Sequence, residues 1–144
     1  MAFAMLAGTE RQQRPADRIL EVPIMVTVKD EVAWFTGTGI LSQEEILSAI
    51  DGLFSESPVK RAILDLRGAS LSDISPDRFG AITRAGQAHA AARGPGARTV
   101  VCVPNEASQL LVRAFAAYSA DSSVIRYDAF LTIEECLDWL GRDD

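Results

Sequence analysis

Side chains that could carry out chemistry are few in this sequence, and their spacing matches no known catalytic motif. His89 is the only histidine, and no serine is flanked by the glycines of a nucleophile elbow. A hydrolase triad needs an activated serine or cysteine beside such a histidine. His89 instead falls near the end of a predicted helix, on its apolar side, which is typical of a structural histidine. We therefore predict no catalytic residue and no enzyme, with an enzyme of unrecognised type as the last alternative.

Metal binding is not indicated either. One histidine and two separated cysteines provide none of the ligand spacings of a zinc site. Cys102 lies inside an apolar run and Cys136 at a core-facing helix position, so we expect two buried, reduced thiols. The sequence therefore predicts no metal and no cofactor.

Polar residues that could bind a partner or a ligand gather after the predicted strands. In α/β sheets, ligands collect beyond the carboxyl ends of the strands, where helix N-termini present free amides. The candidate residues for a protein-interaction edge or a phosphoacceptor are Arg67, Ser70, Ser72, Asp73 and Ser75. The candidate residues for a ligand edge are Asn105, Glu106 and Asp128. The alternative is that these side chains only cap helices and form turns, as Ser, Asp and Asn often do.

Ser75 is the preferred phosphoacceptor of this set. It precedes Pro76 at the predicted start of a helix, where the dipole and the free amides stabilise negative charge. A phosphate there would change the surface that a partner meets and leave the fold intact. The alternative is that Ser75 is only an N-cap, whose replacement by alanine costs about 1 kcal/mol.

Asp65 is a carboxylate inside an apolar strand, where a buried charge needs a partner. Arg61 and Arg67 lie on either side of Asp65 along the same strand face, and either could supply that partner. We expect one of these arginines to pair with Asp65.

Five strands are predicted from runs of β-branched, aromatic and apolar residues. The first two form a hairpin closed at Lys29, Asp30 and Glu31, and the glycines at 37 and 39 are expected to end its second strand as a bend. The predicted strands are Ile24–Val28, Val32–Thr36, Ala62–Leu66, Thr99–Val103 and Val124–Tyr127.

Four helices alternate with the later strands. Ser42 and Glu45 form a capping box for a helix that ends near Ser57, before Pro58, and Thr132 and Glu135 repeat the box. The other helices run from Ser75 to about Ala92 and from about Ala107 to Tyr118, and the last one ends at Leu140. The order β-β-α-β-α-β-α-β-α predicts an α/β fold with a single mixed, mostly parallel five-stranded sheet. Ala62–Leu66 and Thr99–Val103 should be adjacent interior strands, because both are apolar on both faces.

Composition limits the classes of partner. The 144 residues fit one domain, expected at 19–144 behind a loosely ordered arm at 1–18. A net charge of −6 argues against nucleic acid, and no apolar stretch reaches the roughly 20 residues of a transmembrane helix. Free cysteines and the lack of a signal peptide favour the cytosol. Trp34, Phe35 and Trp139 are surface candidates that favour a homodimer.

Three segments carry a resemblance to a known family. They read ILDLRGA at 63–69, TVVCVP at 99–104 and IEECLDWL at 133–140. From Val22 to Leu140 the chain resembles the STAS domain family, typified by anti-sigma-factor antagonists. It is most similar to the SpoIIAA-like branch labelled STAS/SEC14-like. The resemblance implies a SpoIIAA-like sheet wound with helices, no catalysis, and a regulatory role in recognising a protein partner.

The resemblance leaves two functions open. Phospho-regulated members carry an Asp-Ser-Ser-Gly loop, and here Asp73 and Ser75 match it whereas Ile74 and Pro76 do not. The same winding occurs in CRAL-TRIO lipid-binding domains, which implies a small apolar ligand instead. A protein-interaction module predicts a solid core and a flat edge around Ser70. A ligand-binding module predicts an apolar pocket with few polar groups.

Overall fold

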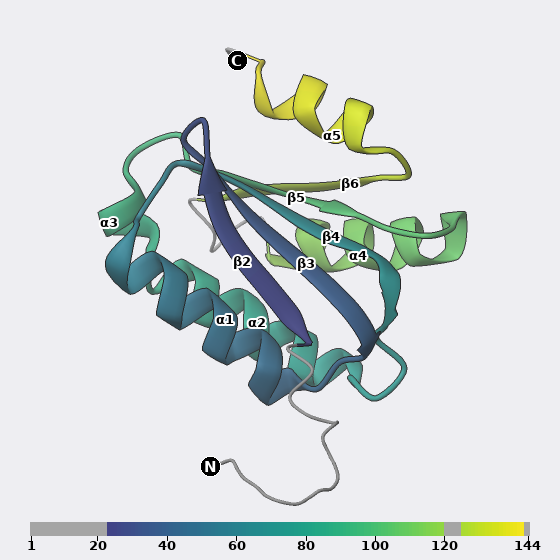
Figure 1. The fold of residues 1–144 in the computed structure, drawn as a ribbon. Coiled ribbons are helices and arrows are strands. Elements are labelled where there is room, and N and C mark those ends of the chain that lie inside the picture. Colours follow the sequence, from purple (N-terminus) through teal and green to yellow (C-terminus); the bar gives the residue numbers. More distant parts are fainter. Residues whose placement is uncertain (1–22, 120–124, 143–144) are drawn as a thin grey trace, which may run out of the picture.

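The computed structural model describes residues 23–119 and 125–142, so the expected arm at 1–18 lies outside the described residues. Its five strands form one sheet in the order β2-β3-β4-β5-β6 (Figure 1). They are β2 (Ile24–Lys29), β3 (Val32–Ile40), β4 (Arg61–Ser70), β5 (Arg98–Cys102) and β6 (Arg126–Phe130). β2 is antiparallel to β3 and the other pairs are parallel, which confirms the predicted mixed, mostly parallel sheet.

β4 and β5 are adjacent interior strands, as predicted from their apolar runs. Ala62 pairs with Thr99 and Leu64 with Val101, and β3 and β6 cover the outer edges of the two strands. Ala62, Ile63, Val100 and the rest of β5 are buried. A strand with apolar side chains on both faces is stable only where both faces are covered.

The helices divide unequally between the two faces of the sheet. They are α1 (Gln43–Glu56), α2 (Pro76–Gln87), α3 (Ala90–Arg93), α4 (Glu106–Ser119) and α5 (Ile133–Leu140). Figure 1 shows α1 and α2 side by side under one face and α5 alone over the other face, above β5 and β6. α4 packs against β6 and α2, on the side of α1 and α2.

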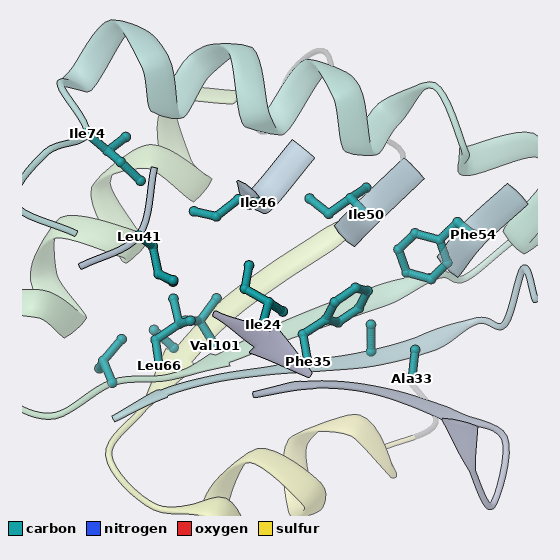
Figure 2. Packing of buried hydrophobic residues seen from close by; sticks show 13 residues of the cluster. Ile24, Ala33, Phe35, Leu41, Ile46, Ile50, Phe54, Leu66, Ile74 and Val101 are labelled. Atoms are coloured by element: carbon teal, nitrogen blue, oxygen red, sulfur yellow. The ribbon is translucent and has the colours of Figure 1, made fainter. Parts of the chain in front are cut away.

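Each face has its own core. Between the sheet and α1, Ile46, Ile50 and Phe54 point toward Phe35 and Val101 (Figure 2). Phe35 and Phe54 meet with their ring centroids 5.7 Å apart. The other core joins the sheet to α5 through these buried residues: Ile63, Val100, Cys102, Cys136, Trp139 and Leu140.

The start of α1 confirms the predicted capping box. The Glu45 amide donates to Ser42 Oγ at 3.1 Å, and the Ser42 amide donates to Glu45 Oε1 at 2.8 Å. Leu41 and Ile46 are both buried, as the two ends of a hydrophobic staple should be. At α5 only half of the box forms. The Thr132 hydroxyl accepts from the Glu135 amide, but the Glu135 carboxylate accepts from the Thr132 hydroxyl and not from the Thr132 amide.

The glycines after Thr36 do not end the second strand, contrary to the prediction. β3 continues to Ile40 with a shift of register between Thr36 and Thr38. Gly37 is buried, and a Cβ there would lie 2.9 Å from Leu41 Cδ1. The glycine therefore admits a core side chain at a bulge, and the pairing resumes beyond it.

Two other element boundaries were wrong. The helix expected to reach Ala92 is interrupted, because α2 ends at Gln87 and the short α3 follows a turn at Ala88 and His89. The last strand is β6 at Arg126–Phe130 instead of Val124–Tyr127, and residues 120–124 are not described.

The aromatic residues expected at the surface do not support a homodimer. Phe35 is 3% exposed and Trp139 6% exposed, and Trp34 packs against the α5-side core. These rings fill the two cores, so self-association stays a prediction that the aromatic residues do not support.

Two serine N-caps provide a matched test of the capping analysis. Ser75 has the extended backbone of an N-cap but no side-chain capping bond, unlike Ser42. Ser42→Ala should lower the free energy of unfolding by about 1 kcal/mol, because it removes the bond to the Glu45 amide. Ser75→Ala should change it by less than about a third of that. If urea unfolding shows that the two variants lose the same free energy of unfolding, this assignment is wrong.

Candidate functional site

The predicted interaction edge is partly assembled at the carboxyl ends of the strands. Ser70, Ser72 and Asn105 line a surface hollow of about 320 Å³, together with Ser108 and Leu111. The Ser70 hydroxyl donates to Ser72 Oγ at 3.0 Å, and the Ser108 amide donates to Asn105 Oδ1 at 2.9 Å. These bonds are those of a turn and a helix cap, which was the alternative explanation for the polar residues.

The other predicted residues do not line this hollow. Asp73, Ser75 and Glu106 are exposed beside it. Asp128 lies within β6 instead of in a loop, and accepts from Arg113 Nε at 2.8 Å. Its expected place at the ligand edge is wrong, because β6 starts and ends later than the sequence indicated.

Arg67 is committed to Asp65, which confirms that the carboxylate in the strand pairs with an arginine. Arg67 Nε and Nη2 donate to the two Asp65 oxygens, each at 2.9 Å. These hydrogen bonds lower the pKa of Asp65 below its usual value, although burial opposes the shift. The pair uses two of the five guanidinium donors of Arg67, so three remain on a half-exposed side chain.

A second space lies between the sheet and the helices, and it is open to solvent about as much as the surface hollow is. It has a volume of about 100 Å³, and we call it the helix-side cavity. Its wall is mostly apolar and comes from α1, α2, α4 and the central strands. The lining residues are Ile46, Ile50, Phe54, Leu64, Leu66, Leu71, Ile82, Thr83, Gly86, Arg93, Thr99, Val101, Val112, Ala116 and Tyr127. Three of them, Leu66, Leu71 and Val112, also line the surface hollow, so the two spaces adjoin.

Arg93 is the charged side chain among the described residues that line the helix-side cavity, and it is only 3% exposed. Its guanidinium donates to the carbonyls of Val59, Lys60 and Arg98 at 2.8–2.9 Å, and to Thr99 Oγ1 at 3.0 Å. It also lies 4.4 Å from the ring centroid of Phe54. Burial lowers the pKa of Arg93 to about 10, which still leaves it charged at neutral pH.

Tyr127 completes the polar end of the cavity. Its hydroxyl accepts from Gln87 Nε2 at 3.5 Å. Burial raises the pKa of Tyr127, and the nearby Arg93 charge opposes that shift only partly. A Cβ on Gly86 would come within 3.0 Å of this hydroxyl, so the phenol rests against a helix position without a side chain.

No signal in the sequence marked this polar end. Arg93 follows three alanines and precedes Gly94 and Pro95, a setting typical of a solvated helix C-terminus. Its burial depends on the break at His89, which turns α3 toward the start of β5. The break and the burial are both tertiary effects.

Cys102 and Cys136 are buried, as predicted, and His89 lies beside Asp51 and Phe54. His89 Nε2 lies 2.8 Å from Asp51 Oδ1, and its ring packs on Phe54 at 5.8 Å between centroids. Cys102 and Cys136 are free and buried, and burial raises the pKa of both thiols, that of Cys136 to about 12. Such thiols are poor nucleophiles at neutral pH.

Two kinds of feature are absent from the described part of the chain. Within 23–119 and 125–142, no three metal-ligating side chains come together. None of the helices described there is long and apolar enough to cross a membrane.

The fold is shared with solved structures. An uncharacterized protein of the DUF3478 family with a SpoIIAA-like fold, from Shewanella loihica PV-4, is 14% identical. It aligns with a TM-score of 0.51 over 81% of this chain and 91% of that one. A candidate anti-sigma factor antagonist from Thermotoga maritima is 17% identical, with a TM-score of 0.47 over 83% of this chain and 95% of that one. No protein-family model matches the chain, and no curated protein matches it in sequence.

These likenesses concern the fold alone, because so low an identity is compatible with different sites and functions. The chain has a SpoIIAA-like fold, as its resemblance to the STAS family implied.

The Asp65–Arg67 pair has a measurable consequence at acid pH. Because the folded-state pKa of Asp65 lies below 3.8, its usual value, the pair stabilises the fold fully above that pH. The stabilisation is lost as the pH falls from there through the folded-state pKa. Asp65→Asn should therefore flatten the fall in unfolding free energy below pH 4, measured by urea unfolding at stepped pH. Asp73→Asn, an exposed carboxylate in the next loop, is the control. Parallel curves for wild type and Asp65→Asn would contradict the assignment.

Proposed function

We propose that this chain is a non-catalytic binding module that holds a small apolar molecule in the helix-side cavity. The observation that carries the proposal is the cavity itself, a mostly apolar pocket between the sheet and the helices that is partly open to solvent. An apolar pocket with few polar groups is the feature that separates a ligand-binding module from a protein-interaction module with a solid core. It favours the ligand over the regulatory protein partner that the family resemblance put first.

The size of the cavity limits the ligand. An engineered apolar cavity of about 150 Å³ binds benzene, so a space of about 100 Å³ fits roughly four to six non-hydrogen atoms. The surface hollow shares Leu66, Leu71 and Val112 with the cavity, and we propose it as the route in. A whole lipid chain would need the helices to move apart.

The groups in the wall support binding without turnover. Arg93 stays protonated, and the raised pKa of Tyr127 keeps its phenol neutral at physiological pH. Thr83 and Thr99 bring hydroxyls, but among the described residues that line the cavity there is no carboxylate, histidine or cysteine to activate them as nucleophiles. This set can hold and orient a molecule and lacks a general base.

A neutral probe tests the proposal without assuming a head group. Benzene should shift the NMR signals of methyl groups around the cavity, such as those of Ile50 and Val101, in a saturable way. Ala116→Leu should weaken this binding at least tenfold, because Ala116 lines the cavity and the larger side chain fills it. Ala117→Leu, on the exposed side of the same helix, is the matched control and should bind as wild type does. If benzene at its solubility limit shifts no core methyl group of the wild type, the cavity is closed and the proposal is wrong.

Recognition of a protein partner at the strand ends is the second candidate function. Leu110 is 70% exposed and Leu111 44% exposed, and Leu111 borders the hollow that contains Ser70 and Ser72. Neighbouring exposed leucines favour a protein contact. Ser75, exposed near this hollow, is the proposed site of regulation by phosphate. The cytosolic location stays a prediction from the sequence.

This second candidate predicts a difference between two forms of the chain. Ser75→Asp adds a negative charge at the start of α2, so it should change which proteins a pull-down from the native host recovers. Ser75→Ala is the control for loss of the hydroxyl alone. Intact-mass measurement of the native protein should show a phosphate. If both variants recover the same proteins in the same amounts as wild type, and no phosphate is found, regulation at Ser75 is excluded.

A further inference from the structure

The positive charge at the end of the helix-side cavity is not matched by a negative one. Among the residues that the structure describes, the partners of the Arg93 guanidinium are three carbonyl oxygens and one hydroxyl. Carbonyl dipoles solvate the cation but leave its net charge in place. An isolated charge in an apolar interior is costly, and buried charges in proteins are normally paired.

Hydrogen-bond donors also remain unused at the Arg93 end of the helix-side cavity. A guanidinium has five N–H donors, and the bonds of Arg93 use Nε once, Nη1 once and Nη2 twice. One Nη1 hydrogen therefore has no protein acceptor within 23–119 and 125–142. Tyr127 stays protonated, and its hydroxyl bond with Gln87 is one that it accepts. Its own hydrogen is a second donor close to the Arg93 charge.

We infer that the ligand of the helix-side cavity is a short-chain monocarboxylate, held with its carboxylate against Arg93 and Tyr127 and its carbon chain among the apolar side chains. This inference rests on the proposed function. A carboxylate accepts from both donors and neutralises the guanidinium, and charge-assisted bonds of this kind are about twice as strong as neutral ones. With roughly four to six non-hydrogen atoms to fit, the acid has about four carbons.

Other head groups fit this end less well. An alcohol can accept one bond but brings no charge. An ammonium group would place a second cation beside Arg93. A dianion such as phosphate would bury a surplus negative charge against the apolar wall, which includes Phe54 and Val101.

The competing interpretation is that Arg93 is only a structural clamp between α3 and the starts of β4 and β5. In that case, binding depends on the apolar tail and not on the head group. A series of ligands with the same tail separates the two interpretations on the unaltered protein.

Butanoate, butanol and butylammonium form that series, each titrated by NMR in competition with benzene. We expect butanoate to bind at least tenfold more tightly than butanol, and butylammonium not to displace benzene. Equal or tighter binding of butanol would overturn the inference while the proposed function stands. If benzene binds and none of the series displaces it, the inference is also wrong. If benzene itself does not bind, the proposed function fails first.

Substitutions test which groups of the protein bind the carboxylate. Tyr127→Phe removes one donor and leaves the Arg93 clamp in place, so it should weaken butanoate about three- to tenfold and leave butanol unchanged. Ser108→Ala, in the surface hollow, is the control and should change neither. Arg93→Met should abolish the preference for butanoate if it folds. If it does not fold, Tyr127→Phe decides, and an equal effect of that variant on butanoate and butanol would refute the assignment.

Discussion

Burial of the Arg93 guanidinium is the interaction on which the helix-side layer depends. By donating to carbonyls of Val59, Lys60 and Arg98, it ties the end of α3 to the residues at the starts of β4 and β5. The aromatic ring of Phe54 covers the cation from α1. The same contacts hold a full positive charge inside an apolar layer, where low polarisability strengthens its field. Any molecule that enters the cavity meets this charge.

The two faces of the sheet are packed differently, and the helix-side cavity lies on the face that α1, α2 and α4 cover. On the α5 side, a single helix places Cys136, Trp139 and Leu140 directly on Ile63 and Val100, and these side chains are fully or nearly fully buried. On the other side several helices share the sheet, and small residues of α2 and α4 face the centre. Gly86 leaves room for the Tyr127 hydroxyl, and Ala116 borders the space beyond.

The sequence predicted the elements whose signals are local. The capping box at Ser42, the buried run at 62–66 and the order of strands and helices were sufficient for the sheet and its topology. The boundaries at Gly37, Ala88 and β6 were wrong because tertiary packing decided them. For the site, the sequence identified polar residues at the strand ends, of which only Ser70, Ser72 and Asn105 share a hollow. It could not identify Arg93 or Tyr127, whose burial depends on how distant segments pack.

We propose the helix-side cavity as a binding space with an anion-binding end, and the position of a bound acid tests this. Intermolecular nuclear Overhauser effects can be measured between butanoate and the methyl groups of the chain. The account predicts contacts from the terminal methyl group of butanoate to Ile50, Leu64 and Val101. Contacts confined to the exposed Leu110 and Leu111, with no change at the core methyl groups, would contradict it.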